Sequence, residues 1–180
     1  HDSLPHDKPR LLEAMNHSGI HEALVLDSMS LASNPMAGNR RILEITRDEP
    51  RLHPAWSLFL PHSREFPPPA EIVAQMRDSG VGAAWLMYRH FGLPLDDWAV
   101  DELLEPFAQA RVPLFLSPDS TMEGGIDRTD WTGVVRICRQ FPTLPVIVSE
   151  SRIYRSQRAL YEALAACPNL KLDLSSVWLH

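Results

Sequence analysis

Polar and charged side chains that can do chemistry follow short apolar runs at several points along the chain. Arg89 and His90 come directly after the run at 83–87, and Ser117 follows the run at 113–116. If these runs are parallel strands, their carboxyl ends meet at one edge of the sheet, and the side chains after them gather there. Other runs are followed by further residues of this kind: Asp27, Ser28, His62, Glu150 and Arg152.

Two kinds of chemistry are available in this set. His90 and Glu150 are the candidate catalytic residues, because imidazole and carboxyl groups serve as general acids and bases. Arg89 and Arg152 are candidate substrate-binding residues, because two guanidinium groups can hold a carboxylate through paired hydrogen bonds. Arg152 could equally pair with Glu150 and do nothing else. Two more residues complete the predicted substrate-binding set: His62 and Ser117.

Short apolar runs alternate with segments of helical pattern along the whole chain. The runs start roughly 25 to 33 residues apart, which matches one strand and one helix per step. We therefore predict a single α/β domain over 1–180 with a parallel sheet. The predicted strands are 23–26, 55–60, 83–87, 113–116, 146–148 and 170–174. The helices between them are 36–48, 70–79, 97–110, 130–141 and 156–166, and one more helix opens the chain between Pro9 and Gly19.

Two architectures accommodate this alternation, an open doubly wound sheet and part of a (β/α)₈ barrel. An open sheet that binds nucleotides would normally carry a glycine-rich turn after its first strand. No apolar run is followed by G-x-G-x-x-G or by G-x-x-x-x-G-K-[ST]. The sequence therefore favours the barrel.

Six helix-then-strand phrases occur in a fixed order: LLEAMNHSGIHEALVL, NRRILEITRDEPRLHPAWSLFLP, MRDSGVGAAWLM, LLEPFAQARVPLFLSPD, VVRICRQFPTLPVIVSES and ALAACPNLKLDLSS. In this order they resemble the amidohydrolase-related family of TIM barrels, which contains metal-dependent hydrolases and some decarboxylases. The resemblance covers strands two to seven of that barrel. It implies an incomplete barrel whose active site forms at the carboxyl ends of the strands.

The outermost predicted strands have apolar edges that need a cover. A (β/α)₈ barrel typically has ~250 residues, and this chain has 180. Left open, the strands at 23–26 and 170–174 would present buried-type edges to water, which promotes aggregation. We therefore expect further chain segments, or another copy in a homo-oligomer, to cover these edges.

The metal chemistry of the resembled family needs imidazole ligands after its fifth and sixth strands. Here those positions hold Ser117 and Glu150. A serine hydroxyl is a poor ligand for a divalent ion, whereas a carboxylate is acceptable. The resemblance thus implies zinc or manganese as the cofactor, but the residues do not support it, and Glu150 is the single ligand that survives.

Composition excludes several functional classes. Seventeen Lys and Arg against 23 Asp and Glu give a net charge of −6, so we expect no nucleic-acid partner and no anionic membrane surface. No apolar run approaches the ~20 residues that span a bilayer. Cys138 and Cys167 have no metal-ligand spacing, and their small number favours a reduced, cytoplasmic setting.

These observations support two functional hypotheses. In the first, the protein is an amidohydrolase-related hydrolase or lyase that acts on a small carboxylate-bearing or cyclic substrate. In the second, it is a metal-free barrel that binds a ligand or a partner subunit without catalysis. The loss of imidazole at Ser117 and Glu150 favours the second hypothesis, and the ordered phrases favour the first.

Overall fold

The computed structural model describes residues 7–32, 34–60, 66–117, 129–149 and 158–173. Within them a single parallel sheet has the strand order β1-β2-β3-β4-β5-β6. The strands are β1 (Ala23–Val25), β2 (Leu52–Ser57), β3 (Ala83–Leu86), β4 (Leu114–Leu116), β5 (Val146–Val148) and β6 (Leu170–Leu172). The helices are α1 (Lys8–His17), α2 (Met29–Ala32), α3 (Pro35–Thr46), α4 (Pro69–Asp78), α5 (Asp97–Ala110), α6 (Trp131–Gln140) and α7 (Arg158–Ala166).

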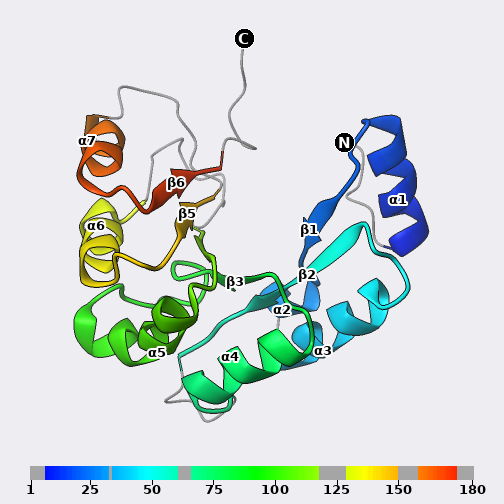
Figure 1. Cartoon of the computed structure of the whole chain (residues 1–180), viewed down its shortest axis with the longest axis horizontal. Helices are drawn as coiled ribbons and strands as arrows, with labels where there is room; N and C mark the ends of the chain where they lie inside the picture. Colours follow the sequence, from blue (N-terminus) through cyan, green and yellow to red (C-terminus); the bar gives the residue numbers. More distant parts are fainter. Residues whose placement is uncertain (1–6, 33, 61–65, 118–128, 150–157, 174–180) are drawn as a thin grey trace.

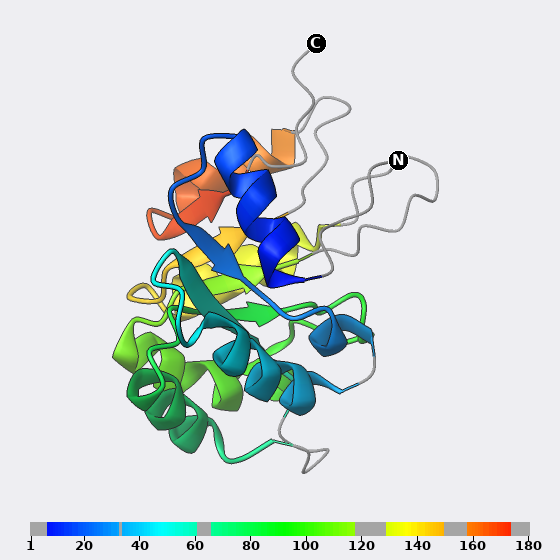
Figure 2. The ribbon, with the colours of Figure 1, turned by 90° about the vertical axis from the view of Figure 1, so that its right-hand side faces the viewer.

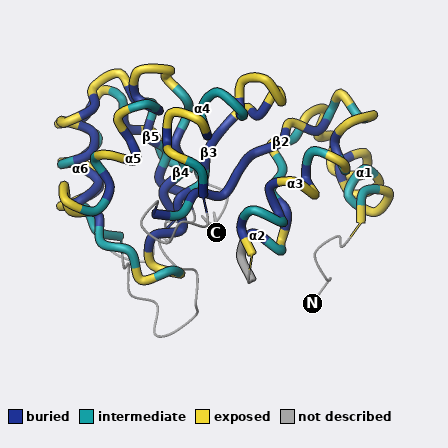
Figure 3. Tube along the Cα trace, turned by 90° about the horizontal axis from the view of Figure 1, so that it is seen from below, coloured by how far each residue is buried: buried dark blue, intermediate teal, exposed yellow. Residues whose placement is uncertain are grey.

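The sheet curls into an incomplete barrel with helices α3 to α7 along its outer side (Figure 1). Figure 2 shows the strands side by side and pointing in one direction. Buried residues concentrate in the strands, and exposed residues lie on the outer surfaces of the helices (Figure 3). This arrangement confirms the predicted alternation of parallel strands and helices. None of the described helices is long and apolar enough to cross a membrane.

The helices begin and end at the residues that the sequence marks. Asp7 caps α1 by accepting a hydrogen bond from the Arg10 N–H at 2.9 Å, and Asn34 caps α3 through the Ala37 N–H at 2.9 Å. Gly19 follows α1 with φ of +68°, a left-handed conformation that glycine adopts at little cost. Local capping chemistry therefore sets the length of these helices.

Strand β2 begins earlier than the sequence indicates, at Leu52 rather than at residue 55. Pro54 lies within this extension and has no N–H to donate. Its carbonyl accepts from the Gly82 N–H at 2.9 Å, so the missing N–H also lies on the β3 side of the strand. Pairing with β3 starts only at Ala55, opposite Ala83. The proline therefore removes no hydrogen bond from the ladder.

Helix α2 is a further difference, because the sequence predicts only a loop after β1. Asp27 begins it by accepting a hydrogen bond from the Met29 N–H at 2.8 Å. The same carboxylate lies 3.5 Å from the Nε atom of Arg41 on α3. Asp27 is buried, and through these two contacts its carboxylate links the end of β1 to α2 and α3.

The hydrophobic core lies between the sheet and the outer helices. Alternate strand residues, such as Leu86, Leu116 and Val148, are fully buried and belong to this core. The residues between them face the concave side, where Trp85 stacks on Phe115 with ring centroids 4.5 Å apart. The concave row is Ser57, Trp85, Phe115, Ile147 and Lys171, paired strand by strand.

Gly38 lies where α3 packs closely against α2. A Cβ atom at this position would lie 2.5 Å from the backbone nitrogen of Ser30. We expect Gly38→Ala to lower the free energy of unfolding by about 1–3 kcal/mol, because the backbone of α2 must shift. The matched control is Gly82→Ala, since the nearest atom to that Cβ is 3.9 Å away. Thermal unfolding would contradict this packing if both variants kept the stability of the parent.

Candidate functional site

The carboxyl ends of β3 to β6 lie at one level. Backbone hydrogen bonds extend the ladder one residue past each strand and pair Met87, Ser117, Ser149 and Asp173 side by side. The bonds run from Ser117 N–H to the Leu86 carbonyl (3.1 Å), from Ser149 N–H to Leu116 (3.1 Å) and from Asp173 N–H to Val148 (2.9 Å). We call these four residues the second row. Because side chains alternate along a strand, the second row faces the concave side, two residues beyond Phe115 and Ile147 on their strands.

The second row presents hydroxyl groups rather than imidazoles. Ser117 and Ser149 are both buried, and the exposed fraction of Ser149 is 0%. The Oγ atom of Ser149 has no hydrogen-bond partner among the described residues. A buried polar atom of this kind calls for a bound water, an ion or a ligand group. The hydroxyls can hydrogen-bond a neutral or anionic oxygen, but they hold a divalent ion poorly.

Asn39 positions the end of β2 after β1 has ended. Its side-chain amide donates to the Ser57 carbonyl at 2.9 Å, and its amide oxygen accepts from the Ser57 N–H at 2.9 Å. Both bonds are buried, and together they replace a neighbouring strand at this edge. The side chain of Asn39 therefore keeps β2 extended up to its carboxyl end.

His90 lies beside the ends of β2 and β3. Its ring contacts Phe91 edge-on, with centroids 4.8 Å apart, and Phe91 meets Phe59 in the same geometry at 5.0 Å. Phe59 follows β2 in the register of the second row. His90 is exposed, so its ring is accessible to a substrate at this edge.

Arg89 lies in a tight turn that follows β3. The turn closes through bonds from Gly92 N–H to the Arg89 carbonyl at 3.0 Å and from Leu93 N–H to the Tyr88 carbonyl at 2.6 Å. Gly92 has φ of +63°, which only glycine adopts readily. Arg89 lines a pocket between this turn and the start of α6, together with Tyr88, Asp130 and Trp131.

Tyr88 joins β3 to α6. Its hydroxyl oxygen accepts a hydrogen bond from the Asp130 N–H at 3.1 Å, and the Arg89 charge acts on the phenol. Burial raises the pKa of the Tyr88 phenol, an effect that the hydrogen bonds and the Arg89 charge reduce only in part. The phenol is therefore a neutral hydrogen-bond donor at physiological pH.

Three predicted site residues, His62, Glu150 and Arg152, lie outside the described residues. Of the others, Ser117 stands in the second row, His90 lies beside it, and Arg89 lines the pocket next to α6. Ser149 and Tyr88 are not among the site residues predicted from the sequence. Ser149 follows its apolar run directly, as Ser117 does, and this was a readable signal. The role of Tyr88 depends on Asp130, 42 residues away, which no local pattern indicates.

The described residues do not form the metal site of the resembled family. They contain no group of three or more His, Cys, Asp or Glu side chains able to hold a metal ion. The positions at the ends of β4 and β5 hold Ser117 and Ser149, whose hydroxyls suit a divalent ion poorly. The donor set of this part of the chain therefore does not fit zinc or manganese.

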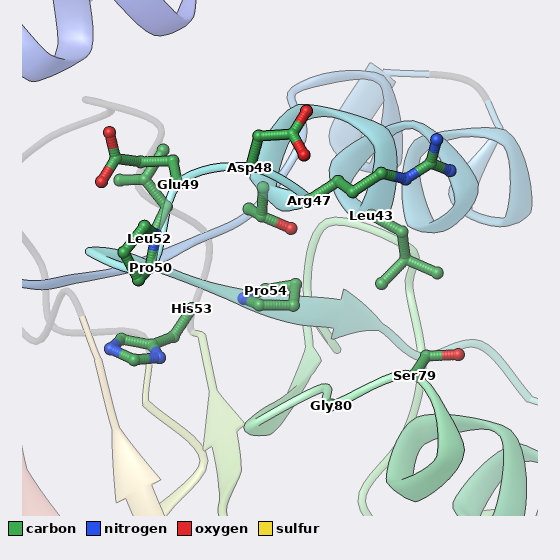
Figure 4. Close-up of a pocket in the computed structure, with 11 residues that line it drawn as sticks. Leu43, Arg47, Asp48, Glu49, Pro50, Leu52, His53, Pro54, Ser79 and Gly80 are labelled. Atoms are coloured by element: carbon green, nitrogen blue, oxygen red, sulfur yellow. The ribbon is translucent and has the colours of Figure 1, made fainter.

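A second pocket opens at the opposite, amino-terminal end of β2 (Figure 4). It lies between the end of α3 and the turn after α4, and it includes His53. Figure 4 shows the charged groups of Arg47, Asp48 and Glu49 pointing in different directions. The Nε2 atom of His53 is hydrogen-bonded to a carboxylate oxygen of Glu22 at 2.7 Å. These groups do not converge on a ligand, so this pocket is a weaker candidate than the carboxyl-terminal edge.

Two solved structures share this architecture. A TIM-barrel protein from Bordetella bronchiseptica, described as uncharacterized, superposes with a TM-score of 0.62 and 20% sequence identity, over 90% of this chain and 57% of that one. The fold is that of a TIM barrel. A dihydroorotase from Campylobacter jejuni matches with a TM-score of 0.54 and 17% identity, over 81% of this chain and 41% of its own.

The likeness to these TIM barrels concerns the fold alone, because both identities are low. This chain spans about half the length of the two solved structures. No family model matches the sequence, and no curated protein is similar to it in sequence. In TIM barrels the active site lies at the carboxyl ends of the strands, which is where the second row and His90 stand here.

The burial of Tyr88 predicts a late alkaline titration. Because its pKa is raised, the phenol ionises above the ordinary value of about 10, and the folded state loses stability as the pH rises beyond that value. Absorbance at 295 nm should show a late component that Tyr88→Phe removes. Tyr161→Phe, at an exposed tyrosine, is the control and should keep it. Loss of the late component in the control alone would show that the assignment is wrong.

Proposed function

We propose that this protein is an amidohydrolase-related hydrolase or lyase that acts on a small carboxylate-bearing or cyclic substrate. The observation that carries the proposal is the common level of the strand ends, where Ser117, Ser149 and Asp173 lie side by side with His90 nearby. The fold shared with a dihydroorotase supports the hydrolytic version. Fold likeness alone does not determine chemistry, so the proposal depends on the residues at this edge.

In this proposal His90 is the general base and acid. It removes a proton from water as the water oxygen attacks the substrate carbonyl carbon, and it returns a proton to the leaving nitrogen as the C–N bond breaks. The Ser117 and Ser149 hydroxyls hydrogen-bond substrate oxygens, and Arg89 binds a carboxylate. Glu150, His62 and Arg152 retain the catalytic and binding roles assigned from the sequence. No step passes through a metal ion, because the described donor set does not suit one.

A second candidate function is ligand binding by a metal-free barrel without catalysis. It is favoured by one observation, the pair of buried serines at the ends of β4 and β5. The same residues serve either function, since hydroxyls bind oxygen groups whether or not a bond is broken. Measured turnover of a substrate distinguishes the catalytic function from ligand binding without catalysis.

Replacement of His90 tests the catalytic proposal. A panel of cyclic amides and imides, with and without a carboxylate substituent, is incubated with the intact protein, and proton release reports hydrolysis. We expect turnover of a carboxylate-bearing member and a loss of about 10²-fold or more in kcat for His90→Ala. His53→Ala, an exposed histidine at the opposite end of β2, should keep the parent rate. Equal losses in the two variants, or no turnover of any member, would contradict the proposal.

Metal content tests the role of the serine positions. We expect the purified protein to hold less than about a tenth of an equivalent of zinc, manganese or iron, since hydroxyls are poor ligands. Elemental analysis of the protein and of Ser117→Ala and Ser149→Ala measures this. Near one equivalent of metal in the parent, lost in either serine variant, would show that these side chains do hold an ion.

A further inference from the structure

The pocket between the β3–α5 turn and the start of α6 combines hydrogen-bond donors with apolar walls. It has a volume of about 840 Å³ and is open to solvent. Tyr88 and Arg89 supply the donors, and Leu93, Pro94 and Trp131 supply the apolar surface. The pocket therefore offers a small organic molecule one polar end and one apolar side.

The Tyr88 hydroxyl accepts a hydrogen bond but donates none to the residues that the structure describes. Tyr88 is 2% exposed, and its hydroxyl oxygen already accepts from the Asp130 N–H at 3.1 Å. Among the residues that the structure describes, no acceptor for the O–H proton is present. A buried donor without an acceptor is costly, so this phenol is set to donate to a molecule in the pocket. Its raised pKa keeps the proton in place at neutral pH.

Arg89 adds a positive charge next to this donor. Its guanidinium is exposed and carries several N–H groups, of which the contact with Tyr88 uses only a part. A phenol O–H and a guanidinium that lie together suit the two oxygens of a carboxylate. The geometry thus favours a planar oxyanion over a neutral or cationic group.

Asp130 limits the charge that the pocket accepts. Its carboxylate caps α6 by accepting from the Gly133 N–H at 3.0 Å, so it remains in the pocket wall when a ligand enters. A second negative charge on the ligand would be repelled by this carboxylate. The pocket is therefore suited to a monoanion.

Arg136 fixes the two walls relative to each other. From α6 it donates to the Leu95 carbonyl through Nε at 3.0 Å and Nη2 at 2.8 Å, and its Nη1 lies 2.7 Å from the Asp101 carboxylate on α5. Because these bonds are in place without a ligand, little ordering is needed on binding.

We propose that this pocket binds a small monocarboxylate with a flat apolar body, whose oxygens accept from Tyr88 and Arg89 while its body lies against Trp131 and Pro94. The inference rests on the proposed function in one respect, the binding of a carboxylate by Arg89. It adds Tyr88 as a second donor, Asp130 as the residue that selects a single charge, and an apolar wall as the recognition surface for the rest of the molecule.

Benzoate is a suitable probe, and benzamide is its neutral counterpart. Binding to the intact protein is followed by ¹H–¹⁵N chemical shifts, which also report whether each variant is folded. We expect saturable, millimolar binding of benzoate and at least about tenfold weaker binding of benzamide. Arg89→Ala should weaken benzoate binding by about tenfold or more, and Tyr88→Phe by about threefold or more.

Arg139→Ala removes an exposed arginine from the other end of α6 and should leave the benzoate affinity unchanged. The proposal is overturned if benzoate and benzamide bind equally, if folded Arg89→Ala keeps the parent affinity, or if benzoate does not bind. Should Tyr88→Phe fail to fold, the Arg89 variant and the benzamide comparison still decide the question. Benzoate binding by a protein that hydrolyses no cyclic amide would support the pocket and contradict only the proposed reaction.

Discussion

The uninterrupted parallel register of the six strands is the constraint on which the rest of this structure depends. Each strand pairs with the next in sequence order, and backbone bonds carry the ladder past the strand ends to Ser117, Ser149 and Asp173. Helices cover the outer side because alternate strand residues there are fully apolar and buried. A shift of one strand by one residue would turn its concave residues toward the helices and bury polar groups in the core.

Sequence patterns predict the strands of this sheet well because each is a short apolar run bounded by turn signals. These patterns fail where a structural feature depends on residues far apart in the sequence, or where an element is too short to show a pattern. Helix α2 has four residues, too few for a periodicity, and Pro54 is tolerated because β3 begins only at Ala83. Ser117 and His90 are predicted as site residues because they follow apolar runs, and both follow strands of the sheet in the structure. The Tyr88–Asp130 bond joins residues far apart in the chain, so only the folded structure reveals it.

Among the residues that the structure describes, the strand ends carry the hydroxyls of Ser117 and Ser149 and the carboxylate of Asp173, and Arg89 and His90 follow β3. The resemblance puts Ser117 at one of the two positions where metal-dependent hydrolysis needs an imidazole, and the Ser117 hydroxyl, like that of Ser149, suits oxygen groups instead. Arg89 and His90 are adjacent in the chain; Arg89 lines the pocket beside α6, and His90 contacts Phe91. The turn closed by Gly92 holds both residues at the carboxyl-terminal edge and thereby links the pocket to the row of strand ends.

The central claim is that the carboxyl-terminal edge of the sheet, rather than the opposite end, recognises small molecules. Hydrogen–deuterium exchange of the intact protein with and without benzoate tests this most directly, because amides that a ligand orders exchange more slowly. The account predicts slower exchange in the turn at Arg89–Leu93 and in the first turn of α6, with no change at 46–52 at the other end of the barrel. Slower exchange confined to 46–52 would place recognition at the wrong end and contradict the account.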